Sequence, residues 1–558
     1  MHGFQLHKYL PLLMYGNNNL GVQPSHPGSI KCMLESDDKG NGFLNDFRAA
    51  LAQGYGEYLE TLITWLEGLG LGYSAQISYN LPIDMETNID RVTAPECESS
   101  AFNNNIDGYR QFSGATNVAQ KPVISNEIGD DLNKALRLPM FELLGQISSA
   151  FAGGSNQLVF HGQTFTGDYY ETTLPGYLAF FLLFSESYMN KQPAWTLGMP
   201  DAINYIIRNQ YILHQGQPRT DIAFYNKVSY TDPQLSTIYP GDDLVNNGYT
   251  YSYLNPTNLN LSQAYVSNNL LAPESPAYQA LVVTAREIVT LEAVSKIQEL
   301  ANAGLPIIIS GGLPGYYTSG NGSLQKSVQE ALQTLQGSRN VHTAENGQIA
   351  AKLNELDIRP RVEVFAPRNV TWYPILRSDK STDYAFLFST ESASMGHVIV
   401  NSTKTPYILN SWTGERTALL GYQVQGQTTK IPLSLAPNET AILAFSNDWA
   451  LEVATPPLHA VHVPSNVLGY NVTSSGSLAV HAKTGSLPSD HLLKLSNGKT
   501  FNISASAALS SFSLNGWELV AEHWEAPRSM SDATIVAEKH NTTHHLNSLV
   551  SWLDIAGL

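Results

Sequence analysis

Three strand-sized apolar runs constrain the fold of this chain more than any other feature of its sequence. They occupy residues 72–80, 122–127 and 157–163, and each one ends in polar side chains. Helix-length amphipathic segments alternate with them, which predicts a parallel sheet. Polar residues at successive strand ends are typical of the rim of a (β/α) barrel, where side chains from several strands meet around one pocket.

We expect the barrel strands at 72–79, 122–127, 157–161 and 221–225, with a long loop through Glu98 between the first two. Four strands make only half of an eight-stranded barrel. Further along, residues 280–283 and 305–309 read as strands of a second α/β unit. From about Arg361 the hydrophobic period becomes two, which predicts antiparallel sheets. The fold class expected is therefore multidomain, α/β plus β.

The composition excludes several classes of protein. The chain has 558 residues, too many for one hydrophobic core, and only 14% of them are charged. A formal charge of −17 with no basic stripe argues against a nucleic-acid partner. No apolar run reaches the length of a membrane span, so we expect no membrane insertion. The first residues lack the charged and apolar regions of a secretion signal.

Cysteines and glycosylation sequons add little to the assignment. The two cysteines, Cys32 and Cys97, form neither a disulfide framework nor a zinc site, and one bridge between them stays an open alternative to a buried Cys97. Eight Asn-x-Ser/Thr sequons occur, close to the roughly six that chance predicts for this composition. They predict a glycoprotein only if the chain is secreted, and lie at Asn260, Asn321, Asn369, Asn401, Asn438, Asn471, Asn502 and Asn541.

Three glutamates are the candidate catalytic residues. Glycoside hydrolysis needs two carboxyl groups at the scissile bond, one as acid and the other as base or nucleophile. Glu96 and Glu98 are two residues apart, so an extended backbone puts both on one side. Glu127 closes a buried-looking run and must find a polar cavity or a partner. The alternative for each is a solvated or helix-capping glutamate.

Polar residues near the same strand ends are candidate sugar ligands. His161 closes an apolar strand and could equally be a hydrogen-bonded core histidine. A glycine cluster at 311–315 matches no phosphate-binding motif, and Pro314 lacks an amide donor, so a tight turn is favoured there. The candidate donors and acceptors for sugar hydroxyls are Gln76, Tyr79, Asn80, Asp84, His161 and Gln163.

Several segments together resemble one family, the fungal secreted relatives of glycoside hydrolase family 106, the α-L-rhamnosidases. They are Tyr9-Leu10-Pro11-Leu12-Leu13, the Gln76 and Asp84 segment, Ala94-Pro95-Glu96-Cys97-Glu98, Ser125-Asn126-Glu127, Phe160-His161-Gly162-Gln163, Leu174-Pro175-Gly176 and Arg208-Asn209-Gln210-Tyr211. The resemblance implies a carbohydrate or glycoside substrate, an extracellular location and an inverting mechanism. It also implies a calcium ion that often helps to hold the sugar.

The resemblance further implies roles and domains. The general base would lie in the acidic segment of Glu96 and Glu98, with Glu98 favoured, Glu127 beside it and His161 as a sugar contact. Relatives extend well beyond this chain at both ends, and the general acid would lie upstream, so we expect a truncated chain. The domains implied are a partial (β/α)-barrel catalytic region at 1–235, a flavodoxin-like unit at 236–360, a β-sandwich at 361–450 and a partial galactose-binding-like jelly roll at 451–558.

Two other functions stay open at this point. One is a non-catalytic carbohydrate-binding relic, because half a barrel lacks the expected acid. The second, weaker one is a polysaccharide lyase that would use Tyr79 or His161 on a uronate. The favoured prediction is a glycosidase that removes a terminal sugar, with α-L-rhamnose as the implied sugar.

Overall fold

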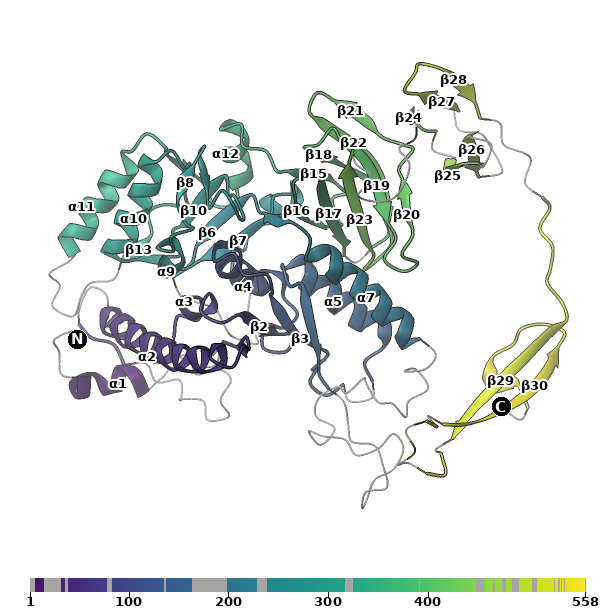
Figure 1. Cartoon of the computed structure of the whole chain (residues 1–558), viewed down its shortest axis with the longest axis horizontal. Coiled ribbons are helices and arrows are strands. Elements are labelled where there is room, and N and C mark those ends of the chain that lie inside the picture. Colours follow the sequence, from purple (N-terminus) through teal and green to yellow (C-terminus); the bar gives the residue numbers. More distant parts are fainter. Residues whose placement is uncertain are drawn as a thin grey trace.

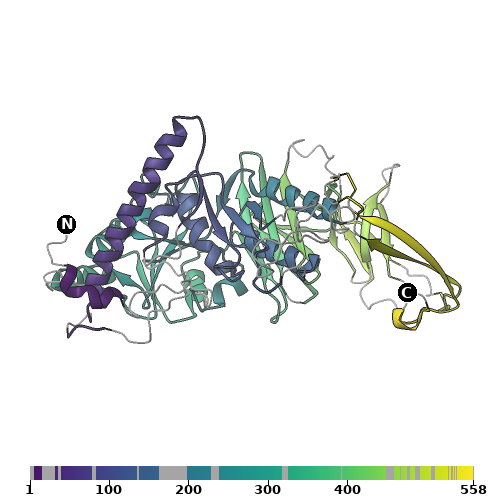
Figure 2. The ribbon, with the colours of Figure 1, turned by 90° about the horizontal axis from the view of Figure 1, so that it is seen from below.

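The computed structural model (Figures 1 and 2) shows several sheets arranged along the molecule, with the N-terminal helices at one end and the last strands at the other. The structure describes residues 6–14, 32–35, 39–77, 83–134, 137–162, 198–227, 238–316, 325–390, 392–447, 456, 458–464, 467–473, 478–483, 491–503, 509–525, 527–529, 532, 534–535 and 537–556.

The first sheet is parallel, with strand order β1-β2-β3-β4. Its strands are β1 (Ser74–Gln76), β2 (Ala94–Glu98), β3 (Ser125–Ile128) and β4 (Gln157–Phe160). The expected loop through Glu98 is therefore wrong in part, because residues 94–98 form β2; Pro95 removes one amide donor and weakens the sequence signal of a strand. The helices of this region are η1 (Leu6–Tyr9), α1 (Leu10–Met14), α2 (Asn41–Glu67), α3 (Glu86–Ile89), α4 (Ile106–Val118) and α5 (Met140–Ala152).

Alternation along these strands separates an apolar face from a polar one. Cys97 is fully buried and packs with Ile89 and Phe112 of the helices α3 and α4. Its Sγ receives the side-chain amide of Asn126 at 3.1 Å, and no disulfide joins it to Cys32. The neighbouring glutamates of β2 must therefore point to the opposite face.

The second sheet is also parallel, with order β14-β12-β10-β6-β7. Its strands, numbered along the chain, lie in the order 5-4-3-1-2 and are β6 (Ile222–Tyr225), β7 (Tyr251–Leu254), β10 (Ala280–Thr284), β12 (Ile307–Ser310) and β14 (Val341–Ala344). We expected residues 221–225 in the barrel, but β6 pairs with β7 and β10. The sequence of a four-residue apolar strand is compatible with either sheet, and its hydrogen-bonded neighbours determine which sheet it joins.

Helices cover both faces of the second sheet. Val294 and Leu332, of α10 and α11, pack in the core on one face, and Leu244 and Leu353, of α8 and α12, pack on the other. The elements are α8 (Asp243–Asn246), α9 (Pro256–Leu259), α10 (Leu291–Asn302), α11 (Gln325–Gln336) and α12 (Ile349–Glu355), with short pairs β8 (Val266–Ser267) and β9 (Leu270–Leu271), and β11 (Ile288–Val289) and β13 (Gly315–Tyr316).

Two antiparallel sheets follow and pack face to face around a core that includes Trp372 and Val398. One has the order β15-β18-β22-β21, and the other β20-β19-β23-β17-β16-β5. Their strands are β5 (Gln217–Arg219), β15 (Val362–Phe365), β16 (Trp372–Ser378), β17 (Thr382–Ser389), β18 (Ser394–Val400), β19 (Thr405–Leu409), β20 (Arg416–Ala418), β21 (Gln423–Gln425), β22 (Thr428–Leu435) and β23 (Thr440–Ser446). The predicted change to antiparallel strands near Arg361 is confirmed.

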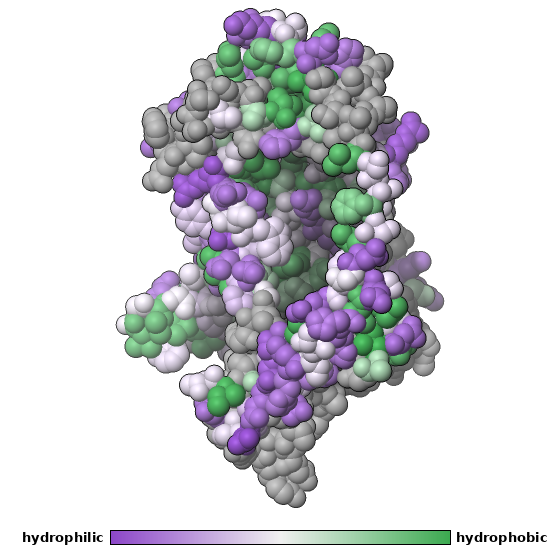
Figure 3. All heavy atoms as spheres, turned by 90° about the vertical axis from the view of Figure 1, so that its right-hand side faces the viewer, coloured by the Kyte–Doolittle hydropathy of each residue, from purple (hydrophilic) through white to green (hydrophobic). Residues whose placement is uncertain are grey.

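Helices α5 and α7 (Met199–Leu213) pack on the outer face of the six-stranded sheet, where Phe151 meets Phe386 edge-on with ring centroids 6.1 Å apart. Beyond the sandwich, the described residues form short antiparallel sheets. Figure 3 views the molecule from the right-hand side of Figure 1, where these sheets lie, and shows apolar and hydrophilic residues interspersed on that surface. These sheets comprise β24 (Ala460–His462), β25 (Val467–Val472), β26 (Leu478–Ala482), β27 (Leu492–Leu495), β28 (Thr500–Asn502), β29 (Trp517–Glu525) and β30 (Glu538–Leu546), before η4 (Trp552–Asp554). The chain is thus a mixed α/β and β protein. Across the described residues, every helix is too short or too polar to cross a membrane.

Candidate active site

The polar face of the first sheet gathers the predicted glutamates. Strand register places Glu98 opposite Glu127 and Glu96 opposite Ser125. Because residues opposite each other on parallel strands project to the same face, these three carboxyl groups share one surface. All three side chains are partly buried, and Ser125 Oγ donates to Glu96 Oε2 at 2.7 Å. The sequence prediction that carboxyl groups from neighbouring strands come together is met here.

Glu98 is held in its neutral form by its surroundings. Burial, a hydrogen bond with Asp130 and the negative charges of Asp130 and Glu127 together raise the pKa of Glu98 to about 9. Asp130 is itself buried, and Ser100 donates its backbone N–H to Asp130 Oδ1 at 3.1 Å, while the Ser99 hydroxyl donates to the same oxygen. At neutral pH Glu98 therefore keeps its proton, next to its hydrogen-bond partner Asp130.

Glu127 lies in a different environment on the adjacent strand. Burial raises its pKa, while the side-chain amide of Gln76, which donates to Glu127 Oε2, and the nearby His161 favour its ionised form. His161 is fixed at the end of β4 by its backbone N–H, which donates to Ile128 O at 2.9 Å. Gln76, Glu127 and His161 thus form one group, as the sequence analysis predicted.

The remaining sequence candidates divide into two sets. Asp84 does not join this group, because its carboxylate pairs with Arg48 Nε at 3.2 Å and with Lys227 Nζ, in a buried ion pair toward the second sheet. Its predicted contact with sugar hydroxyls gains no support. Tyr79, Asn80 and Gln163 lie outside the described residues.

Asp130 is a site residue that sequence reasoning missed. It follows β3 by two residues, after Gly129, which has a φ of 88°. The glycine reverses the backbone and brings the carboxyl back toward Glu98, a turn that only glycine adopts readily. The segment Glu127-Ile128-Gly129-Asp130 contained that signal, in a glycine placed between two acidic residues at a strand end.

The arrangement can hold and move a proton beside a polar group. Carboxyl groups whose surroundings favour the neutral form to different degrees are what acid–base hydrolysis uses. Among the described residues, no three Asp, Glu, His or Cys side chains are grouped to hold a metal ion. The calcium ion that the resemblance implies therefore has no donor set there, and no step proposed below uses it.

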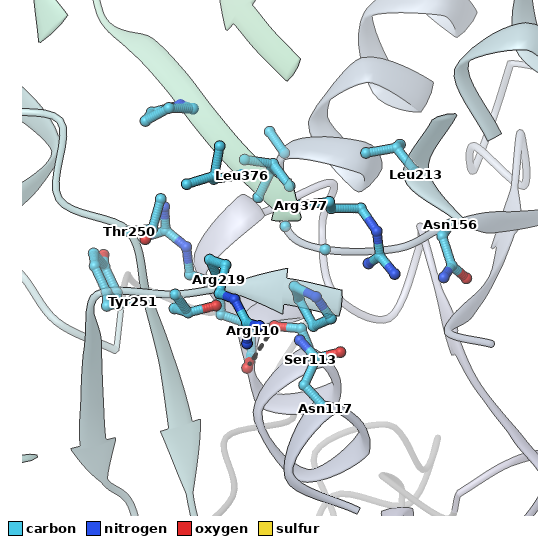
Figure 4. A pocket seen from close by; sticks show the side chains of 17 residues that line it. Arg110, Ser113, Asn117, Asn156, Leu213, Arg219, Thr250, Tyr251, Leu376 and Arg377 are labelled. Carbon is cyan, nitrogen blue, oxygen red and sulfur yellow. Dashed lines mark hydrogen bonds between the residues drawn. The ribbon is translucent and has the colours of Figure 1, made fainter. Parts of the chain in front are cut away.

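A separate cavity lies where α4, β5, β7 and β16 meet (Figure 4). Its volume is about 30 Å³, the space of roughly one liquid water molecule. Arg110 stacks its guanidinium 3.8 Å from the centre of the Tyr251 ring, and Arg377 donates from Nε to Gln215 O at 2.6 Å. These arginines are engaged in joining the units, so the cavity is a structural junction rather than a substrate site.

Comparison with known proteins identifies the family. A sequence profile described as alpha-L-rhamnosidase, that of glycoside hydrolase family 106, matches residues 21–424, well over half of the chain. The chain belongs to glycoside hydrolase family 106. No curated protein sequence gives a significant match. The resemblance inferred from the motifs around Glu98, Glu127 and His161 is thereby confirmed at the level of the family.

One solved structure shares the fold of this family 106 chain. The rhamnosidase from Novosphingobium sp. PP1Y matches with a TM-score of 0.61 and 16% identity, over 92% of this chain and 52% of that one. The chain therefore spans about half the length of that protein. The apo exo-carrageenase GH42 from Bacteroides ovatus matches with a TM-score of 0.46 and 12% identity, over 77% of this chain and 60% of that one.

Proposed function

We propose that this chain carries out the hydrolysis of a terminal α-L-rhamnoside, with the carboxyl groups of β2 and β3 activating the attacking water. The observation that carries the proposal is the register of Glu98 against Glu127, with Asp130 bonded to the first and Gln76 to the second. Membership of family 106 supports rhamnose as the sugar. An extracellular location follows from the resemblance and is part of the proposal.

The roles of the two glutamates follow from their charge states. The family resemblance favoured Glu98 as the base, but a carboxyl with a pKa of about 9 is protonated at neutral pH and is not available to accept a proton. We assign the base to Glu127, which would take a proton from the attacking water. Glu98 keeps its proton beside it and so adds no second negative charge next to Glu127.

Both glutamates act on one side of the scissile bond in this proposal. Neighbouring strands lie about 4.8 Å apart, whereas the acid and base of an inverting glycosidase are separated by roughly 6.5–9.5 Å. Residues in register on adjacent strands are thus placed to work together on the water side. The inverting mechanism that the resemblance implies then takes its leaving-group proton from another carboxyl.

The parallel sheet with helices between its strands supports a partial (β/α) barrel as the catalytic region. The second sheet supports the flavodoxin-like interpretation, because its strand order is that of the flavodoxin-like doubly wound sheet read from β7. The short antiparallel sheets after residue 460 are proposed to belong to a jelly roll.

The decisive experiment compares Glu127→Gln with the unaltered chain on 4-nitrophenyl α-L-rhamnoside. Loss of a general base lowers the rate by about 10²–10⁴-fold. Because base catalysis acts on the water, the same loss should appear with a rhamnoside that has a poorer leaving group. The matched control is Glu67→Gln at the exposed end of α2, which should keep full activity.

Two results would contradict this proposal. Full activity of Glu127→Gln would remove Glu127 as the base. An unaltered chain that is stabilised against heat by L-rhamnose, yet releases no nitrophenol, would instead support the non-catalytic carbohydrate-binding alternative. A nuclear magnetic resonance assay of the anomer released first distinguishes inversion from retention.

A further inference from the structure

A second cavity lies at the carboxyl ends of the strands of the second sheet. It has a volume of about 170 Å³, and its lining includes Tyr225, Thr284 and Ser310, the last residues of β6, β10 and β12. Strand β6 has β7, the next strand of this sheet along the chain, as its neighbour on one side. Its neighbour on the other side is β10, the strand that follows β7 in this sheet. This is the point where strand order reverses, the place at which open α/β sheets bind ligands.

Several polar groups that line this cavity can form hydrogen bonds with a ligand. Glu287 is 8% exposed, and Lys227 donates its backbone N–H to Glu287 Oε2 at 3.0 Å, which satisfies one oxygen. Within the described part of the chain, the hydroxyls of Thr284 and Ser310 and the side-chain amide of Asn346 make no hydrogen bond. Ser310 is buried, Thr284 is half-buried and Asn346 is exposed, so their polar groups can form hydrogen bonds with a polar molecule that enters the cavity.

Aromatic rings form another part of the wall. Phe224, Tyr239 and Tyr253 all line the cavity, with ring centroids 4.9 and 5.6 Å from Phe224. The two tyrosine hydroxyls are already bonded, Tyr239 to Asp243 at 2.6 Å and Tyr253 to Asp107 at 2.8 Å. These side chains therefore offer apolar ring surface rather than further hydrogen bonds, which suits a ligand with both C–H and hydroxyl faces.

Phosphate and metal ions fit this cavity poorly. The glycine turn beside it uses its amides internally, since Gly311 N donates to Ala344 O at 2.8 Å and Gly315 N donates to Glu287 O at 2.9 Å. The buried carboxyl of Glu287 also disfavours an anion. A single acidic side chain beside Arg286 is too few ligands for a divalent cation. The sequence preference for a tight turn over a phosphate cradle agrees with these bonds.

We propose that this cavity binds a small neutral polyhydroxy compound of monosaccharide size, at a site separate from the carboxyl groups of the first sheet. Its volume equals roughly that of five or six liquid water molecules. Glu287 accepts hydrogen bonds from ligand hydroxyls, and Thr284, Ser310 and Asn346 both donate and accept. The ligand's C–H groups lie against the aromatic wall.

Calorimetric titration of the full chain with L-rhamnose, D-glucose, glycerol and inorganic phosphate tests the proposal. The titrations use the Glu127→Gln background, in which catalysis at the first site is lost, and Glu127 does not line the second cavity. Changes in binding on substitution of the cavity residues therefore report the second cavity. Burial raises the pKa of Glu287 to about 7, so the titrations are run at pH 8, where its carboxyl group is ionised. A monosaccharide should bind there, and Glu287→Gln should weaken it by about tenfold or more, because a hydrogen bond to a charged group is lost. Thr284→Val should weaken it about fivefold. Introduced alone into the unaltered chain, Thr284→Val should leave hydrolytic activity unchanged, which separates this site from the proposed function.

Thr343→Val, on the exposed surface of β14, is the matched control and should leave binding unchanged. If Glu287→Gln does not fold, the pair Thr284→Val and Ser310→Ala carries the test. The proposal is overturned if no monosaccharide binds or if phosphate binds in place of the sugars. It is also overturned if the affinity for the monosaccharide is the same in Glu287→Gln, Thr284→Val and Ser310→Ala as without them.

Discussion

Glu98 shows how position alone can change the chemistry of a residue. An ordinary glutamate is ionised at pH 7, yet burial and the neighbouring Asp130 and Glu127 raise the pKa of this one to about 9. Glu127, one strand away, receives an amide hydrogen bond that favours its charged form. Burial raises the pKa of both side chains, but at Glu127 the hydrogen bond from Gln76 opposes that rise, so the two environments differ in how strongly they favour the neutral form.

The alkaline side of the activity profile should report Glu98. We expect kcat/KM on a nitrophenyl rhamnoside to fall as pH rises past about 9, because ionised Glu98 then adds a negative charge beside Glu127. In Glu98→Gln this alkaline fall should disappear, at a lower overall rate. An unchanged profile in that variant would show that another group titrates there.

Stability should depend on pH through the same residue. The folded chain keeps the Glu98 proton up to about pH 9, whereas the unfolded chain releases it near the ordinary value of 4.5, so stability falls as pH rises through this window. Thermal melting should therefore find Glu98→Gln more stable than the unaltered chain at pH 8. The two should melt alike at pH 4, and a constant gap across this range would contradict the assignment.

At the scale of elements, helix α4 connects the first sheet to the second by packing against both. Most of its residues are buried, because the first sheet lies on one side of it and β7 on another. Gly114 lets the backbones touch: a Cβ there would lie 1.9 Å from Tyr253 O. A charged pair also joins helix and strand here. The Tyr253 hydroxyl donates a hydrogen bond to Asp107, whose carboxylate lies 3.5 Å from the Arg110 guanidinium.

Gly114→Ala should be strongly destabilising. The new methyl group would overlap the backbone of β7, and helix and strand would have to separate, at a cost of about 3 kcal/mol or more in the free energy of unfolding. Gly54→Ala is the control, because that glycine in α2 has no atom within 4 Å of the added methyl. It should gain roughly 0.5–1 kcal/mol through helix propensity. Urea midpoints measure both, and equal effects would contradict the close approach.

At the scale of the whole molecule, buried charges join the sheets. Lys227, just after β6, pairs with Asp84 of the first region, and both residues are less than 9% exposed. On the sandwich side, Arg361 Nη1 lies 3.1 Å from Asp221 Oδ1. Such contacts contribute orientation between units, because a charge without its partner is costly to bury.

Removal of one partner of the Asp84 pair should therefore cost more than removal of a surface pair. Lys227→Met is expected to lower the free energy of unfolding by about 3 kcal/mol. The double variant Lys227→Met with Asp84→Asn should recover part of that loss, because the buried carboxylate no longer lacks its lysine partner, while Arg48, which also loses Asp84, is partly exposed. Lys352→Met, which breaks an exposed pair with Glu355, should change stability by about 0.5 kcal/mol. Denaturant midpoints that rank the variants otherwise would contradict this view of the interface.

Local pattern alone determined much of this protein. Hydrophobic period distinguished the parallel from the antiparallel regions, and polar strand ends indicated Glu96, Glu98, Glu127 and His161, because the two-residue repeat of a strand and the end of an apolar run are properties of the chain itself. The motifs around these residues also indicated the family. These features do not depend on which strands become neighbours.

Only the tertiary structure decided what depends on neighbours. Strand β6 joined the second sheet through hydrogen bonds to β7 and β10, and Asp84 was drawn into an ion pair with Lys227. The protonation of Glu98 likewise required Asp130, brought close by a turn at Gly129. Pairing, burial and pKa arise from groups distant in sequence, so residue spacing cannot specify them.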